Sequence, residues 1–187
     1  MRSTLYKLSF ILVSSLFLLN AQSARAQYCV DNLYAVGCLY GDYIDNVSVG
    51  AINQTGTGCG QNGYSDYTNL VADFEQGSTN ALTVTVGNYG QYVSMWIDLN
   101  DDYVFDASEK LVSYLYCSTP GINYTAGFYV SPFATLGEHR MRIRCAQYTF
   151  PLDPCANYFY GEVHDYTVNI TPPMNMVYTS STCTQTE

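Results

Sequence analysis

Apolar and polar side chains alternate with a period of two along much of the chain. The alternation is plainest over residues 81–86 and 138–145, where every second side chain would point to the same side of a strand. Runs rich in β-branched and aromatic residues, bounded by Gly, Asn, Asp and Pro, cover residues 91–98, 110–116, 127–130 and 161–170. No apolar stripe of helical period follows residue 26. The pattern predicts an all-β fold, an antiparallel, jelly-roll-like β-sandwich of about seven short strands.

Turn-forming residues mark the loops and the end of this domain. Residues 53–67 are rich in glycine and are expected to form a long surface loop. Pro172 and Pro173 would end the last strand, which places the domain at residues 27–171. Residues 172–187 then read as a linker or as the first strand of a following module. We expect the chain to be a piece of a longer protein, and the alternative is a short tail that docks back on the sandwich.

The first 26 residues have the pattern of a secretory signal peptide. Arg2 and Lys7 precede an apolar segment, and Ala24-Arg25-Ala26 supplies the small residues of a cleavage site. The apolar segment has about a dozen residues, short of the roughly 20 that span a bilayer. We therefore expect a secreted, extracellular or cell-surface protein that does not insert into the membrane.

Charge narrows the range of partners. The chain has 7 Lys and Arg against 16 Asp and Glu. After residue 26 only Lys110, Arg140, Arg142 and Arg144 remain against all 16 acids, a formal charge of −12. A protein this acidic repels nucleic acid and anionic membrane surfaces, and its natural counterions are metal cations.

The cysteines fit an exported protein, because disulfides persist outside the cytosol. Six of the cysteines fall into two groups along the chain, and we expect local disulfides within each group. The sequence does not choose among the possible pairings. Cys183, the seventh, lies in the tail. The two groups are Cys29, Cys38 and Cys59, and Cys117, Cys145 and Cys155.

Residues 98–109 carry oxygen-bearing groups at the spacing of a twelve-residue calcium loop. A hard cation prefers six to eight oxygen ligands, and alternate residues of a tight loop can aim them at one point. Tyr103 stands at position 6, where glycine normally takes a left-handed backbone. The segment before the loop reads as a strand and not as the helix of an EF-hand. The expected ligands of a structural calcium ion are Asp98, Asn100, Asp102, Val104 through its carbonyl, Asp106 and Glu109.

A hairpin turn without metal is the alternative for this loop. Asp and Asn side chains cap nearby backbone groups, so an acidic turn needs no cation to be stable. Five side-chain donors in register favour the calcium interpretation.

Several separated motifs, taken in order, resemble the GEVED domain family. They are Gly41-Asp42-Tyr43-Ile44, Tyr64-Ser65-Asp66-Tyr67, the acidic loop after Trp96, residues 136–142 and residues 161–170. The resemblance implies a secreted bacterial β-sandwich module of the kind found in multidomain surface or exported proteins of the Bacteroidetes type. It implies no catalytic role, and it implies neighbouring domains that include peptidase, adhesion or sorting domains.

The last motif departs from the family pattern, because His164 stands where Gly-Glu-Val-Glu-Asp has its second Glu. In a strand, Glu162 and His164 point to one face and Asp165 to the other. Glu162, Asp165 and Arg142 are candidates for a second polar or ion site. The alternative is a structural ion pair between neighbouring strands, which the three clustered arginines favour.

Function is expected to be non-catalytic, since no zinc-protease or nucleophile-elbow motif occurs. The leading expectation is a calcium-stabilised extracellular accessory module in adhesion or domain presentation. Tyrosines in or near predicted loops make a carbohydrate-binding module the alternative, and an accessory part of a secreted hydrolase or peptidase is third. The expected partners are a glycan or a cell-surface protein.

Overall fold

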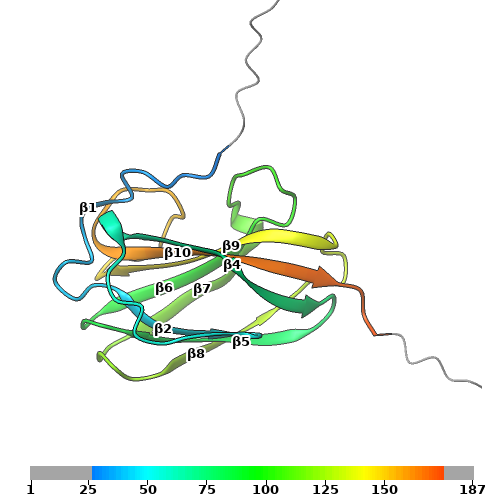
Figure 1. Ribbon diagram of the computed structural model, residues 1–187, viewed down its shortest axis with the longest axis horizontal. Coiled ribbons are helices and arrows are strands. Elements are labelled where there is room, and N and C mark those ends of the chain that lie inside the picture. Colours follow the sequence, from blue (N-terminus) through cyan, green and yellow to red (C-terminus); the bar gives the residue numbers. More distant parts are fainter. Residues whose placement is uncertain (1–26, 175–187) are drawn as a thin grey trace, which may run out of the picture.

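The structure, a computed structural model, describes residues 27–174 and is built from strands in two stacked layers (Figure 1). The predicted signal peptide and the tail that contains Cys183 lie outside these residues. No helix within the described range is long and apolar enough to cross a membrane. The strands are β1 (Tyr34–Gly37), β2 (Ile44–Val49), β3 (Ile52–Gln54), β4 (Tyr64–Glu75), β5 (Thr79–Val86), β6 (Gln91–Ile97), β7 (Lys110–Cys117), β8 (Tyr124–Tyr129), β9 (Gly137–Gln147) and β10 (Tyr158–Thr171).

The larger layer is a six-stranded sheet organised by β10. Its order is β1-β10-β9-β6-β7, and β4 also pairs with β10. One edge of β10 pairs antiparallel with β9. The other edge is shared, because β1 pairs with the start of β10 and β4 with the remainder, both in parallel. The prediction of an antiparallel sandwich was therefore wrong for this sheet, which is mixed.

The smaller layer is a four-stranded antiparallel sheet in the order β3-β2-β5-β8. The inner faces of the two sheets form the main core, as expected for a β-sandwich. Val84 and Val86 of β5 meet the larger sheet there. Its other fully buried members include Ile44, Val47, Leu82, Met95, Met141, Ile143, Tyr166 and Val168.

A second core lies on the outer face of the larger sheet. It contains Trp96, Val163 and Ala146 from the sheet, covered by Leu33 near the N-terminus and by Leu152. Both faces of β9 and β10 are consequently buried, although β9 alternates Met141, Ile143 and Cys145 with the three arginines. The covered outer face gives those arginines an interior environment.

Most predicted strands are confirmed within a few residues, and one predicted loop is wrong. Residues 81–86, 110–116, 138–145 and 161–170 all lie in strands. The expected loop at residues 53–67 ends early, because β4 begins at Tyr64. Tyr64 to Tyr67 are polar enough to be typical of a loop, but they pair with residues 163–166 of β10 and satisfy their backbone there.

Two disulfides join four of the six described cysteines. Cys38 pairs with Cys59, within the first expected group. Cys29 pairs with Cys155 at a sequence separation of 126, so the prediction of purely local bridges was wrong. Cys117 and Cys145 are buried and free. They lie on β7 and β9 with β6 between them, and two strand spacings of about 4.8 Å exceed the reach of a disulfide.

The two disulfides should differ in their effect on stability. By chain entropy, the bridge with a separation of 126 contributes about 5 kcal/mol and the bridge with a separation of 21 about 3 kcal/mol. Urea denaturation should show a larger loss of unfolding free energy for Cys29→Ser/Cys155→Ser than for Cys38→Ser/Cys59→Ser. Equal losses, or the reverse order, would contradict this expectation.

Candidate metal centre and the pocket beside it

The predicted calcium loop connects β6 to β7, two neighbouring antiparallel strands. Asp98 follows β6 directly, and Glu109 closes a short 3-10 turn, Ala107–Glu109, immediately before β7. Both carboxylates are buried, at 0% and 5% exposure, whereas Asn100, Asp102 and Asp106 are exposed. The two strand ends thus fix the first and last expected ligands.

The turn takes the left-handed backbone that position 6 of a calcium loop requires. Tyr103 has a φ of 69° and Asp101 a φ of 56°. Positive φ in a bulky residue costs about 1–3 kcal/mol. Two contacts offset that cost: the Tyr103 N–H donates to Asp98 Oδ2 at 2.9 Å, and its ring packs on Tyr28 with the centroids 5.1 Å apart.

Hydrogen bonds from the backbone hold the carboxylates of the loop. Glu109 Oε1 accepts from Leu99 N and Oε2 accepts from Asp106 N, both at 2.9 Å. Asp102 Oδ1 accepts from Val104 N at 2.8 Å, and Asn100 Oδ1 accepts from Asp102 N at 3.0 Å. These are the bonds of an acidic turn that caps itself, the alternative considered from the sequence.

Asp98 is the exception, because only one of its oxygens is satisfied. Oδ2 accepts from Tyr28 Oη at 2.5 Å and from Tyr103 N. Oδ1 is buried and finds no donor among the described residues. Within residues 27–174, no three side chains of His, Cys, Asp or Glu gather closely enough to hold a metal ion. A cation in this loop would therefore need the amide of Asn100 and the Val104 carbonyl as well as carboxylates.

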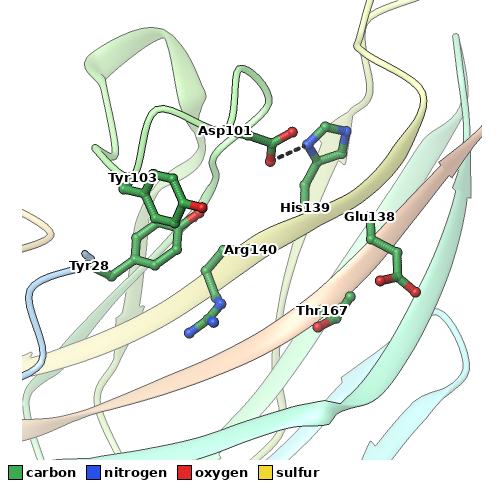
Figure 2. A pocket seen from close by; sticks show the side chains of 7 residues that line it. All are labelled: Tyr28, Asp101, Tyr103, Glu138, His139, Arg140 and Thr167. Atoms are coloured by element: carbon green, nitrogen blue, oxygen red, sulfur yellow. Dashed lines mark hydrogen bonds and ion pairs between the residues drawn. The ribbon is translucent and has the colours of Figure 1, made fainter. Parts of the chain in front are cut away.

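An open pocket lies beside the loop, with walls from four parts of the chain (Figure 2). Tyr28 comes from the N-terminal segment, and Asp101 and Tyr103 come from the loop. The imidazole of His139 lies 3.0 Å from Asp101 through Nδ1 and 2.9 Å from the Thr135 carbonyl through Nε2. The remaining lining residues are Glu138 and Arg140 of β9 and Thr167 of β10.

The three arginines of β9 share the outer face of the sheet, and each stacks on an aromatic ring. Arg140 lies over Tyr28, Arg142 over Phe105 and Arg144 over Tyr34, at 4.7–4.8 Å from the guanidinium carbon to the ring centroid. Arg144 donates to the carbonyls of Leu33, Asp153 and Ala156. The layer therefore fastens the N-terminal segment and the 148–157 loop to the sheet.

The residues of the candidate second site do not lie together, because Glu162 and Asp165 point to opposite faces of β10. Arg142 and Asp165 form a buried, two-pronged pair, with Nε to Oδ1 and Nη2 to Oδ2 both at 2.8 Å. Glu162 lies on the opposite face of β10, where it accepts from the backbone N–H groups of Ile44 and Gly60. The structure brings Arg142 and Asp165 together, as in the ion-pair alternative, and leaves Glu162 apart from both.

His164 occupies the inner face with Glu162. Its Nε2 lies 3.1 Å from Glu162 Oε2, outside hydrogen-bonding geometry, and its Nδ1 lies 3.0 Å from the hydroxyl of Tyr166. Burial raises the pKa of the Tyr166 hydroxyl. The side chain of His164 therefore fills the space between the sheets beside a buried carboxylate.

Tyr28 is a site residue that sequence reasoning missed. It is 70 residues from Asp98, yet its hydroxyl bonds that carboxylate, and burial together with this bond raises the pKa of the hydroxyl. Nothing in the local sequence around Tyr28 signals the contact, because the fold alone brings the segment there.

The buried pair should show strong coupling in stability. A double-mutant cycle with Arg142→Met and Asp165→Leu should give a coupling of about 3 kcal/mol. Asp165→Leu leaves the buried Arg142 without a carboxylate, and Arg142→Met leaves Asp165 with only the longer, 3.3 Å contact to Arg140. The matched cycle of Arg142→Met with Glu162→Gln should be additive within about 0.5 kcal/mol, since the two side chains lie on opposite faces of the sheet. Equal coupling in the two cycles, measured by urea denaturation, would refute this assignment.

Comparison with known proteins supplies the family. No curated protein sequence is significantly similar to the chain. The GEVED domain, as a protein-family model, matches residues 92–169. The match begins in β6 and ends in β10, so it includes the acidic loop, the arginine-bearing strand and the Arg142–Asp165 pair. This chain therefore contains a GEVED domain over residues 92–169.

Proposed function

We propose that this GEVED domain is a non-catalytic, calcium-stabilised extracellular module that serves in adhesion or in the presentation of neighbouring domains. The observation that carries the calcium part is the buried Oδ1 of Asp98, which has no donor among the described residues. A buried carboxylate oxygen without a partner costs free energy that a cation would recover.

Three features of the loop support calcium in particular. Oxygen atoms that can bind a metal ion stand at alternate positions, which suits a cation that takes six to eight oxygen ligands. The left-handed turn at Tyr103 has the backbone that this spacing needs. The exposed side chains of Asn100 and Asp102 bond mainly to each other and to the adjacent backbone, so they can turn inward with little loss of packing.

The extracellular and non-catalytic parts of the proposal have separate support. Two disulfides fit an oxidising environment, as does the signal-peptide pattern in the sequence. The buried acids Glu162 and Asp165 are used to bind backbone N–H groups and arginine, roles that hold strands together. Acids engaged in this way are poorly placed to act on a substrate.

Removing calcium should lower the stability of the domain. Millimolar calcium acting on a weak extracellular site stabilises by about 0.4–1.4 kcal/mol, so excess EGTA should lower Tm by roughly 1–6 °C. The measurement is a thermal melt followed by circular dichroism, with and without EGTA. Asp98→Asn should abolish the difference between the two melts.

The matched control for this experiment is Asp31→Asn, which removes an exposed acid outside the loop. It should keep the full difference between calcium and EGTA. An unchanged melting curve of the wild-type chain in EGTA would rule out the calcium site.

Calcium affinity should fall as the pH is lowered from about 7 towards 5. Burial raises the pKa of the Glu109 carboxyl above its usual range. The protonated acid does not bind calcium, so protons compete with the ion as the pH falls through that raised pKa. Calorimetric titration with calcium should show weaker binding at the lower pH, and Glu109→Gln should bind less tightly but with a smaller pH dependence. Equal wild-type affinities at both pH values would contradict the role of Glu109.

A further inference from the structure

We propose that the pocket beside the acidic loop binds a single neutral sugar unit of a glycan. The pocket is lined by Tyr28, Asp101, Tyr103, Glu138, His139, Arg140 and Thr167 (Figure 2). Its seven residues come from segments far apart in the sequence, and their side chains lie around one pocket.

An aromatic wall forms one side of this pocket. The rings of Tyr28 and Tyr103 pack together at a tilt of 50°. Tyr103 is 46% exposed, a large value for an aromatic side chain that the fold holds at an energetic cost in backbone conformation. An exposed ring of this kind offers a flat apolar face beside polar groups, which suits the C–H face of a pyranose.

The other lining residues supply hydrogen-bonding groups of both kinds. The carboxylates of Asp101 and Glu138 are exposed and accept hydrogen bonds. The guanidinium of Arg140, with a quarter of its side chain exposed, donates them. Vicinal hydroxyls are donors and acceptors at once, so they can satisfy planar carboxylate and guanidinium groups together.

The charge of the pocket argues against other classes of ligand. Two carboxylates beside one arginine and one histidine disfavour an anion, and the acidic surface of the domain does so as well. The contact of His139 with Asp101 and that of Arg140 with Asp165 engage two of the nearby carboxylates, so no cluster of free carboxylates among the described residues faces an organic cation. A neutral polyhydroxyl compound meets the mixed groups without burying a net charge.

The loop and the pocket are joined through one carboxylate. Asp98 Oδ2 accepts hydrogen bonds from both Tyr28 and Tyr103, so the same oxygen positions both rings of the aromatic wall. If calcium occupies the loop, it fixes Asp98 and orders the wall, and sugar binding becomes calcium-dependent. This dependence rests on the proposed function, whereas the pocket itself does not.

The test uses the whole chain after residue 26 and four probes: the methyl glycosides of glucose, galactose, mannose and N-acetylglucosamine. Saturation-transfer NMR in millimolar calcium should detect binding of at least one of them. Tyr103→Gly should weaken that binding about tenfold or more, because the stacking ring is lost. Asp101→Asn should weaken it as well. Absence of binding by all four glycosides overturns the proposal.

Two variants separate the pocket from the calcium site and from nonspecific stacking. Glycine adopts positive φ without strain, so Tyr103→Gly should lose the sugar yet keep the fall in Tm caused by EGTA. Tyr129→Ala removes a tyrosine of similar exposure, 53%, on the smaller sheet and should leave sugar binding unchanged.

The outcomes are distinct. If Tyr103→Gly abolishes sugar binding, the pocket is supported. If the Tm of the domain is also unchanged by EGTA, the proposed calcium dependence is removed while the pocket stands. Binding that survives Tyr103→Gly, or that Tyr129→Ala abolishes, places the sugar elsewhere and overturns the pocket.

Discussion

Stacking of cations on aromatic rings is the interaction on which the larger sheet depends. Arg140, Arg142 and Arg144 each lie over a ring, and Lys110 lies 4.7 Å above the centre of Trp96. These four residues are all the Lys and Arg between residues 27 and 174. Each desolvated contact contributes on the order of 1–2 kcal/mol. Together they turn the outer face of the sheet into a second core, closed by the covering segments and by the Cys29–Cys155 disulfide.

Strand β10 places one buried carboxylate on each face of the larger sheet. Asp165 of β10 neutralises Arg142 on the outer face, while Glu162, three residues earlier, binds backbone N–H groups near β2 on the inner face. Residues 161–165 of this chain therefore carry two buried carboxylates that act on opposite sides of one strand. Neither acid is free to turn, because each has at least two hydrogen-bond partners.

Sequence reasoning succeeded where information was local. Period-two alternation predicted β5 and β9, and a run rich in β-branched and aromatic residues predicted β10. It failed where distant segments decide the outcome. The polar residues at the start of β4 become a strand only because β10 offers them backbone partners, and Tyr28 reaches Asp98 only because the arginine layer holds the N-terminal segment in place.

The placement of the Lys and Arg side chains also affects how accessible the domain is to proteases that cut after them. Enzymes of trypsin-like specificity cut after Lys and Arg, and they need an accessible, extended segment around the cut. Every such residue from 27 to 174 lies within β7 or β9, with its charged group stacked on a ring. Cleavage after these residues therefore requires the strands to open, so digestion of residues 27–174 by a trypsin-like protease would report on the integrity of the arginine layer.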